Sequence, residues 1–564
     1  MPVQFNDEKE EARLDDLRDQ EAEELAQALS AKYGVQYVDL SRTPINTDAL
    51  RLVPEELARE ANAAAFSFSG EKVNVVAVSP VHPKLKEVIE AVKRAGYEEV
   101  TTYIGSPASV ARAWGRYPEI STSFVTKAGE IDISAKQLTL FVDEIKNITD
   151  VNRLVKQSTS EKSTISIILE IILAGALRFD ASDIHIEPEE GAVRIRFRLD
   201  GVLVQVTDID AHTFKLISSR IKLVSALKLN IESARQDGRF SIKLPARGEA
   251  QKEKSMEVRT SVIPGAYGES IVLRILNPDT ISVSLESLGM NDYLLEIIKK
   301  QLAKPNGMIL TTGPTGSGKT TTLYAFLRKV NEPGIKIITI EDPIEYHLPG
   351  ITQTQTDAKK GYTFGEGLKS TLRQDPDIIM VGEIRDAETA KTAVDAALTG
   401  HLVFSTLHTN NAAGAIPRLI DLEVNPKVIG PAVNIALAQR LIRKLCLKCK
   451  KKDAPNDTEK RSVQKILDDI KTRNIEVPAF SSIWRAVGCE ACNEGYKGRI
   501  GIFEGVMIDE KVEEVITKDP SEYDIFRASE HQKILTMSQD GIVKVITGVT
   551  SLEELARVVS LDEE

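Results

Sequence analysis

The side chains best suited to chemistry begin in one short run, Gly313–Thr320, which reads GPTGSGKT. An apolar run, Met308–Leu310, precedes it, and a segment with helical apolar spacing follows. This is the strand–loop–helix setting of the G-x-x-x-x-G-K-[ST] phosphate loop, whose glycines let successive N–H groups face a polyphosphate. Lys319 is then expected to reach the β- and γ-phosphates, and the Thr320 hydroxyl to ligate Mg²⁺. A glycine-rich turn that merely carries a lysine is the plainer alternative. The predicted nucleotide-binding residues are Gly313, Pro314, Thr315, Gly316, Ser317, Gly318, Lys319, Thr320 and Thr321.

Acidic and histidine side chains stand next to predicted strands downstream of this run. Ile335–Ile340 and Ile378–Val381 each predict a strand with carboxylates after it, and Leu402–Phe404 predicts a strand with a histidine on either side. Strands that alternate with helices predict a parallel sheet covered on both faces, and sites in such sheets gather at the carboxyl ends of the strands. Capping or packing at strand ends is the plainer alternative for the histidines. The residues expected near a metal–nucleotide complex are Glu341, Asp342, Glu345, Glu383, His401 and His408.

All four cysteines fall in two pairs, Cys446-x-x-Cys449 and Cys489-x-x-Cys492. Paired C-x-x-C motifs are typical of a structural zinc site with four thiolate ligands. The interval between the pairs is longer than in a simple zinc ribbon, so we expect it to hold a helix of its own at Lys460–Lys471. Unrelated reduced thiols and a redox pair are the alternatives.

Length, composition and charge indicate a globular protein of several domains. At 564 residues the chain is long enough for three or four domains, and its residue usage is that of an ordinary globular protein. Its formal net charge of -11 argues against a nucleic-acid footprint spread over the surface. The longest apolar stretch, Ile165–Leu177, is too short to span a bilayer and carries Glu170, and the N-terminus has no signal-peptide pattern. A reducing cytosol is therefore the expected compartment.

The chain order suggests how these features are divided among domains. In the first part, Val73–Val78 and Val100–Ile104 predict strands on either side of a helix at Pro83–Ala95, which Gly96 is placed to stop. The predicted parts are an acidic arm at 1–20, a small α/β docking domain at 21–115, a linker at 116–150, a mixed α/β domain at 151–285, and an α/β nucleotide-binding domain at 286–564 with a zinc module at 446–500.

The domain at 151–285 carries arginines on predicted strands. Val193–Leu199 alternates apolar residues with arginines, and Asp200-Gly201 after it predicts a hairpin turn. Two later strands carry Arg259 and Arg274. A solvated sheet face is the plainer explanation, but such a face beside a polyphosphate site would supply charge-neutralising arginines.

Several motifs in one order resemble the type II secretion and type IV pilus assembly ATPases over roughly 150–510. After the phosphate loop come EDPIEY, LRQDPDIIMVGEIRD, GHLVFSTLHTN and AQRLIRKLC, at Glu341–Tyr346, Leu372–Asp386, Gly400–Asn410 and Ala438–Cys446. ASDIHIEP and RLDG, at Ala181–Pro188 and Arg198–Gly201, are similar to the family's second N-terminal domain, called N2. The region at 35–115 is more weakly similar to the family's first N-terminal domain.

The resemblance implies roles for the acidic residues. Glu345 would be the base that orients the attacking water. Glu341 and Asp342 would shape the metal shell. Glu383 would act on Mg²⁺ through water.

For the remaining residues, the resemblance implies that His401 and His408 sense the γ-phosphate. It also implies that Arg259 and Arg274 reach the nucleotide from the N2 domain, within a subunit or across an interface. A tetracysteine zinc module together with the extra N-terminal domain marks extension and secretion motors. The tandem R-L-G-type repeats of the family's cyclic-di-GMP-binding variant do not occur here, so that ligand is not predicted.

The expected fold is therefore a RecA-like P-loop ATPase domain with a Cys₄ zinc module, preceded by a mixed α/β N2 domain and a small α/β domain. The expected function is a cytoplasmic, hexameric, Mg²⁺-dependent ATPase that powers assembly of a type IV pilus or a secretion pseudopilus through an inner-membrane platform protein. Membrane association would come through protein partners, without direct nucleic-acid binding. The alternatives are a nucleic-acid-translocating RecA-like motor and a scaffold that binds ATP without cycling.

Overall fold

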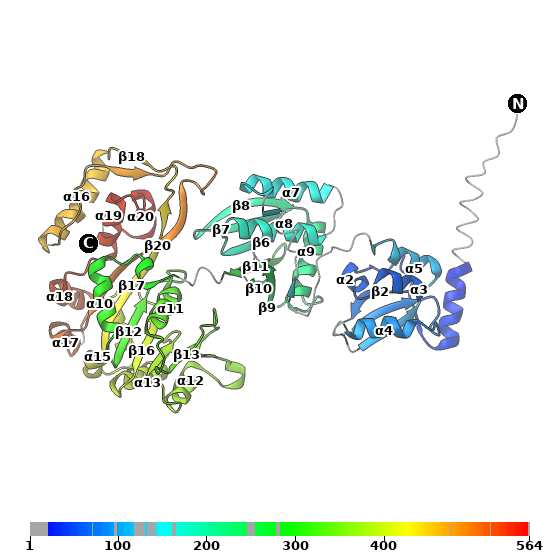
Figure 1. Cartoon of the computed structure of the whole chain (residues 1–564), viewed down its shortest axis with the longest axis horizontal. Coiled ribbons are helices and arrows are strands. Elements are labelled where there is room, and N and C mark those ends of the chain that lie inside the picture. The colour runs from blue at the N-terminus through cyan, green and yellow to red at the C-terminus, as the bar shows by residue number, and fades with distance from the viewer. Residues whose placement is uncertain are drawn as a thin grey trace. The chain divides into compact units, whose positions relative to one another are not determined.

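The computed structural model describes residues 21–69, 72–94, 97, 99–117, 130–131, 141–142, 144–160, 165–244, 254–277, 283–473, 475–518 and 520–561. The chain divides into two compact units, Met1–Leu276 and Asn277–Glu564 (Figure 1). The predicted arm at 1–20, the helix stop at Gly96 and much of the predicted linker lie outside the described residues. The other domain boundaries stay predictions.

The first sheet lies in the N-terminal part of the first unit and has the strand order β1-β4-β3-β2 over the described ranges. β3 pairs in parallel with β4 and antiparallel with β2. The helix predicted between β3 and β4 is present, and it buries Leu85, Val88 and Val92 as its spacing predicts. The elements are β1 (Gln36–Tyr37), α2 (Thr47–Leu50), α3 (Glu55–Glu60), β2 (Ala63–Ser69), β3 (Lys72–Ala77), α4 (Leu85–Arg94), β4 (Glu99–Ile104) and α5 (Pro107–Trp114).

The second sheet, also in the first unit, has the order β5-β9-β10-β11-β6-β7-β8 among the described residues. The predicted hairpin after β7 is present, with positive φ angles of 49° at Asp200 and 87° at Gly201. The elements are β5 (Glu130–Ile131), α7 (Ile148–Ser160), α8 (Ile165–Arg178), β6 (Asp183–Glu189), β7 (Ala192–Leu199), β8 (Val202–Ile209), α9 (Ala211–Val224), β9 (Gln236–Leu244), β10 (Lys254–Gly265) and β11 (Gly268–Leu276).

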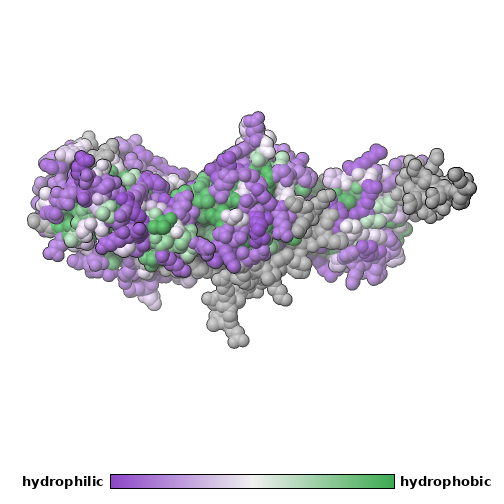
Figure 2. Space-filling view, turned by 90° about the horizontal axis from the view of Figure 1, so that it is seen from above, coloured by the Kyte–Doolittle hydropathy of each residue, from purple (hydrophilic) through white to green (hydrophobic). Residues whose placement is uncertain are grey.

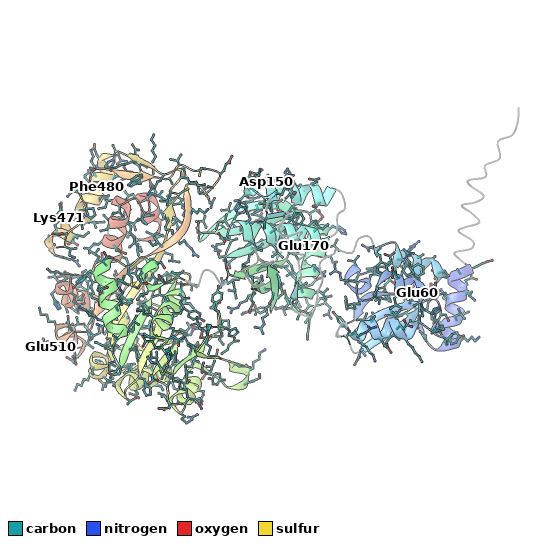
Figure 3. All side chains as sticks on the ribbon, viewed as in Figure 1. Glu60, Asp150, Glu170, Lys471, Phe480 and Glu510 are labelled. Atoms are coloured by element: carbon teal, nitrogen blue, oxygen red, sulfur yellow. The ribbon has the colours of Figure 1, made fainter. Side chains whose placement is uncertain are left out.

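Helices α8 and α9 supply apolar side chains to the core of this second domain. β7 contributes Val193, Ile195 and Phe197 to the same core, because alternate residues of a strand point to one face. α8 also carries Glu170, which is 2% exposed and is labelled within this domain in Figure 3. The apolar stretch noted in the sequence is thus a core helix of a globular domain.

The third sheet forms the centre of the second unit, with the order β14-β13-β15-β16-β12-β17-β20 over the described residues. Its strands pair in parallel except for the antiparallel pair β17–β20 at one edge. The strands are β12 (Gly307–Thr312), β13 (Ile337–Glu341), β14 (Thr352–Gln355), β15 (Ile378–Val381), β16 (Leu402–Leu407), β17 (Val433–Leu445) and β20 (Tyr496–Met507).

Helices cover both faces of this sheet, as the parallel strands require. Met308 and Leu310 of β12 pack into one hydrophobic cluster with α13, whereas Ile309 packs into another with α10 and α11. The helices are η3 (Leu285–Leu288), α10 (Asp292–Leu302), α11 (Lys319–Val330), η4 (Ala358–Lys360), α12 (Phe364–Leu372), α13 (Ala387–Leu398), α14 (Ala415–Asp421), α15 (Pro426–Ala432), α16 (Asp457–Thr472), α17 (Glu510–Ile516), α18 (Glu522–Ser529), η5 (Glu530–Gln532), α19 (Met537–Ile546) and α20 (Leu552–Val558).

The cysteine motifs lie in the connection between the two antiparallel strands β17 and β20. β17 ends at Leu445, immediately before the first cysteine pair, and β20 begins at Tyr496, shortly after the second pair. Between the pairs lie α16, which matches the predicted helix, and a small antiparallel ladder of β18 (Lys451–Asp453) with β19 (Ile483–Arg485). The long β17–β20 pair was not expected from the sequence, where this segment stood out only as a motif.

The surface is mainly polar. Figure 2 shows hydrophilic residues over most of the visible face, with hydrophobic residues gathered in smaller groups between them. In the part of the chain that the structure describes, every helix is too short or too polar to cross a membrane.

Candidate functional site

The phosphate loop connects the buried strand β12 to helix α11. Gly318 is the N-cap of α11 and has a φ of 93°. Because it is a glycine, no side chain bonds to the N–H groups of the first helical turn. A Cβ on Gly313 would lie 2.5 Å from the carbonyl oxygen of Gln439, and one on Gly318 would lie 2.7 Å from its Nε2. The loop is therefore packed against β17 and keeps its helix N-terminus open to an anion.

The polar side chains of the loop fit a polyphosphate. Lys319 Nζ donates to the carbonyl oxygens of Gly313, at 2.6 Å, and Pro314, at 3.3 Å. Burial lowers the pKa of the Lys319 ammonium, and the charge of Glu383 acts in the opposite direction. The Ser317 hydroxyl is buried without a hydrogen-bond partner among the described residues, as a donor reserved for a ligand oxygen would be.

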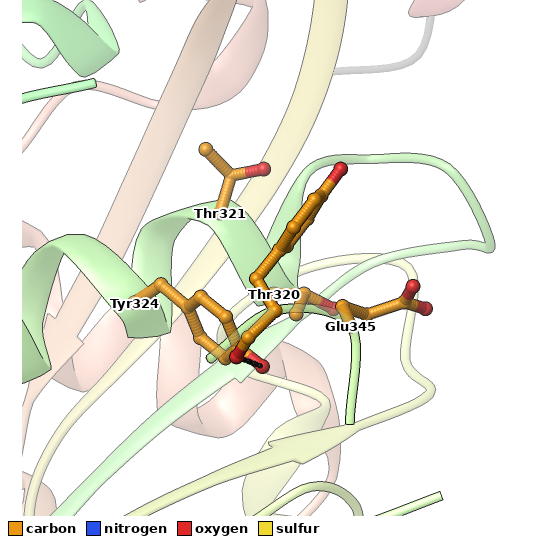
Figure 4. A pocket seen from close by; sticks show the side chains of 5 residues that line it. Thr320, Thr321, Tyr324 and Glu345 are labelled. Carbon is orange, nitrogen blue, oxygen red and sulfur yellow. Dashed lines mark hydrogen bonds between the residues drawn. The ribbon is translucent and has the colours of Figure 1, made fainter. Parts of the chain in front are cut away.

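A pocket of about 150 Å³ opens beside the first turn of α11. It is lined by Thr320, Thr321 and Tyr324 of α11 and by Glu345 and Tyr346 of the segment after β13 (Figure 4). The structure thus brings the hydroxyl predicted to ligate Mg²⁺ and the carboxylate predicted to act as base to one cavity. Oxygen atoms of these types suit a hard cation.

Glu341 ends β13 and is 3% exposed. Its carboxylate accepts hydrogen bonds from the Tyr324 hydroxyl, from Thr339 Oγ1 at 2.6 Å and from Gln353 Nε2 at 3.0 Å. Burial raises the pKa of Tyr324, and the Glu341 charge raises it further, so the phenol stays protonated as the donor. These bonds join α11, β13 and β14 behind the pocket. Asp342, the next residue, is exposed.

Glu383 follows β15 and joins the cluster around the lysine. Its carboxylate pairs with Arg385 and lies 3.4 Å from Nε2 of His408, and its side chain is 13% exposed. The residues on either side of Glu383 are tied to β16, because Thr406 donates its hydroxyl to the Gly382 carbonyl and Ile384 donates its N–H to the Thr406 carbonyl. The carboxyl ends of β12, β15 and β16 therefore present Lys319, Glu383 and His408 together.

The structure does not bring His401 to this cluster within its own chain, and its contact with a γ-phosphate stays a prediction. β12 and β16 run in parallel with Gly307 opposite Leu402 and Thr312 opposite Leu407, so His401 precedes its strand. It lies at the amino edge of the sheet, roughly 20 Å from the carboxyl edge at about 3.3 Å per residue. Its Nδ1 lies 3.1 Å from the Ala396 carbonyl at the end of α13, which is a capping contact.

Arg259 and Arg274 lie in the first unit, opposite each other on β10 and β11. Arg274 Nε donates to Asp183 at 2.9 Å, and the same carboxylate lies 3.3 Å from Nε of Arg198. Arg259 Nε lies 3.8 Å from Glu257. Both arginines are thus on one face of the second sheet, and their contact with a nucleotide stays a prediction.

The two cysteine pairs are distant from each other in the sequence, but their four sulfur atoms lie close together. The Sγ atoms of Cys446 and Cys489 are 3.9 Å apart, and those of Cys449 and Cys492 are 3.7 Å apart. A tetrahedron with metal–sulfur bonds of about 2.3 Å has sulfur atoms about 3.8 Å apart, so the group fits a metal ion. Burial opposes ionisation of Cys446, but the Lys448 N–H and the other thiols lower its pKa to about 7.

One buried contact at the site was missed by sequence reasoning. Gln439 of β17 is 3% exposed, and its Oε1 accepts from the Thr322 hydroxyl of α11 at 2.7 Å. Its signal in the sequence is a glutamine directly after the apolar run IALA, where a buried amide needs a partner. The partner could be found only with the strand order known.

A parallel sheet with a phosphate loop after β12 and acidic residues after β13 and β15 defines a P-loop ATPase domain of the RecA-like type. The Yersinia pseudotuberculosis ATPase DotB, solved by X-ray crystallography, has a similar fold, with a TM-score of 0.50 and 19% identity over 70% of this chain and 94% of that one. A family model described as "Type II/IV secretion system protein" matches residues 158–557. The chain belongs to this family and is an ATPase.

Related proteins are similar in sequence to this chain over most of its length. Type II secretion system protein E of Aeromonas hydrophila is 44% identical over 397 residues, which are 70% of this chain and 75% of that protein. Type IV pilus assembly ATPase PilB of Myxococcus xanthus is 35% identical over 541 residues, 95% of this chain and 91% of that protein. A second model, the MshEN domain, matches residues 33–123, where the sequence is similar to the family's first N-terminal domain.

Proposed function

We propose that this chain is the ATPase motor of a type IV pilus or a type II secretion pseudopilus, working as a homo-hexamer through an inner-membrane platform protein. The observation that carries the proposal is the convergence of Lys319, Glu383 and His408 at one sheet edge, beside the pocket that holds Thr320 and Glu345. The names of the relatives support the assignment to secretion or pilus machinery.

In this proposal ATP binds with its phosphates along the loop and its terminal phosphate toward Glu345. Lys319 leaves the carbonyl oxygens of its loop and binds the β- and γ-phosphates. Thr320, and Glu383 directly or through water, would hold Mg²⁺, which would neutralise phosphate charge and polarise the terminal phosphoryl group. Glu345 orients the attacking water and accepts its proton, and His408 contacts the terminal phosphate while Glu383 fixes its ring.

Arginines of the second sheet would couple hydrolysis to motion, and a zinc site would fix part of the second unit. Arg259 and Arg274 would contact the nucleotide from the second sheet, within a subunit or across the ring, so that phosphate release frees the first unit from the second. An arginine used in this way contributes about 10³–10⁵ in rate. The four cysteines would bind zinc and fix the end of the β17–β20 pair.

The direct test of the proposed activity is steady-state phosphate release by the full-length chain with saturating ATP and Mg²⁺. Lys319→Ala is expected to lose nucleotide binding and to lower turnover at least about 100-fold, because nothing replaces the ammonium on the phosphates. Loss of pilus assembly or secretion in cells that carry this variant would link turnover to the process. Parent-level hydrolysis by Lys319→Ala would contradict the proposal.

A further inference from the structure

Thr312 is the last residue of β12 and immediately precedes the phosphate loop. It is 0% exposed, and the residue opposite it on β16 is Leu407, after which the chain continues into His408. The side chain of Thr312 therefore lies where the lysine loop and the loop that carries His408 leave neighbouring strands. None of the roles described above uses it.

Among the residues that the structure describes, the Thr312 hydroxyl has hydrogen-bond contacts only with Thr409, and there are three of them. The Thr409 N–H donates to Thr312 Oγ1 at 2.8 Å, and the Thr312 hydroxyl can donate to the Thr409 carbonyl at 3.0 Å. The two hydroxyl oxygens are 2.7 Å apart, and Thr409 Oγ1 also donates to the Asn411 carbonyl at 2.8 Å. One side chain thus accepts from the N–H of the residue that follows His408, and its single proton is shared between the carbonyl and the hydroxyl of that residue.

These bonds connect the phosphate loop to the loop that carries His408. Lys319 Nζ donates to Gly313, which is covalently next to Thr312, and Thr409 is covalently next to His408, which lies 3.4 Å from Glu383. The loop after His408 is held again at Ala412, whose N–H donates to Glu504 at 2.8 Å. Because Thr409 is fixed on one side by β12 and Ala412 on the other by β20, the backbone at His408 has little freedom to move relative to the phosphate loop.

We propose that the Thr312 hydroxyl is a positioning device that holds His408 in register with the lysine loop, so that the histidine meets the terminal phosphate of a nucleotide bound there. The inference rests on the proposed role of His408. It assigns to Thr312 no contact with the nucleotide. Loss of the hydroxyl should therefore slow the chemical step while leaving nucleotide binding nearly intact.

The chain offers a matched control in the neighbouring residue of the same strand. The hydroxyl of Thr311 is also buried, but it has no hydrogen-bond partner among the described residues. Thr311→Val and Thr312→Val make the same isosteric change one residue apart in β12, and only the second removes bonds to the histidine loop. Thr312→Ser keeps the hydroxyl and is the conservative rescue.

The experiment measures kcat, nucleotide affinity and melting temperature of the full-length variants. We expect Thr312→Val to lower kcat roughly 10- to 100-fold with nucleotide affinity within about 3-fold of the parent, and Thr311→Val and Thr312→Ser to stay within about 3-fold in kcat. Should Thr312→Val not fold, Thr312→Ala removes the same hydroxyl and leaves a smaller side chain. Equal kcat values for the two valine variants would overturn the proposal.

A double-mutant comparison separates positioning from general stability. If Thr312 acts through His408, Thr312→Val should cost less than about 3-fold in a His408→Ala background, because the group it positions is already gone. The same fold-loss in both backgrounds would contradict the inference while leaving the role of His408 intact. A parent-level kcat for His408→Ala alone would instead remove the proposed role of His408, and this inference with it.

Discussion

At the scale of single residues, direction along a strand decides which side chains can meet at the site. His408 follows β16 and lies against Glu383, whereas His401 precedes the same strand and caps α13. Both stand in the motif GHLVFSTLHTN, so their residue types and spacing alone do not separate them. The rule that sites form at carboxyl ends of parallel strands, applied to each histidine in turn, would have excluded His401.

This difference gives a residue-scale prediction. His408→Ala should lower kcat roughly 10- to 100-fold, because a group beside the terminal phosphate is lost, while His401→Ala should stay within about 3-fold of the parent rate. Steady-state phosphate release by the two variants, with melting temperature as the control for folding, checks the contrast. A larger loss for His401→Ala at unchanged melting temperature would show that His401 acts in catalysis from a place outside its own chain's site.

Glu341 illustrates a role that residue type alone does not reveal. The sequence suggested a part in the metal shell, and the structure shows its carboxylate bonded to Tyr324, Thr339 and Gln353. Thr339 lies two residues earlier in the same strand, whereas Tyr324 of α11 and Gln353 of β14 are brought to Glu341 only by the fold. Glu341 therefore fixes the wall of the pocket from behind.

At the scale of elements, the parallel strands and their helices could be predicted because their signals are local. The run at 378–381 is β15 as expected, and Asp386 caps the helix α13 that follows it. β17 could not be predicted in the same way, because its pattern mixes buried and polar residues. Its pairing with both β12 and β20 is what makes it a strand.

β17 links the cysteine module to the nucleotide site. Gln439 contacts the phosphate loop, and further along the strand Arg443 forms a 2.9 Å ion pair with the buried Glu554 of α20. Burial alone would raise the pKa of Glu554, but hydrogen bonds from Arg557 and Arg443 outweigh it and hold the pKa below its ordinary value. Cys446 follows the strand directly, so the module is attached to a fixed element.

The element-scale prediction concerns the metal. The full-length chain purified without chelator should contain one zinc ion per chain by elemental analysis, because the four thiolates are already placed for tetrahedral ligation. Cys489→Ser should lower the zinc content and the melting temperature. It should leave nucleotide affinity nearly unchanged, since the cysteines are not part of the phosphate loop. A chain free of zinc and fully stable would contradict this assignment.

At the scale of the whole molecule, three large sheets follow one another among the described residues, each packed by its own hydrophobic clusters. The division into domains at 21–115, 151–285 and 286–564 stays a prediction. The arginine faces of the second sheet were visible as the alternation in Val193–Leu199. Which of those arginines meets a nucleotide depends on how one unit docks on the other, or on a neighbouring copy, and no local pattern encodes that. The assignment of Arg259 and Arg274 therefore depends on the family resemblance.

The central claim is that the lysine loop and the acids after β13 and β15 act on one ATP, with Glu345 as the base. The most direct measurement compares ATP binding and single-turnover hydrolysis of Glu345→Gln with those of the parent. The amide keeps the size of the side chain but cannot accept the proton, so we predict ATP affinity within about 3-fold and hydrolysis slowed roughly 10²- to 10⁴-fold. Hydrolysis by Glu345→Gln at the parent rate would contradict the account.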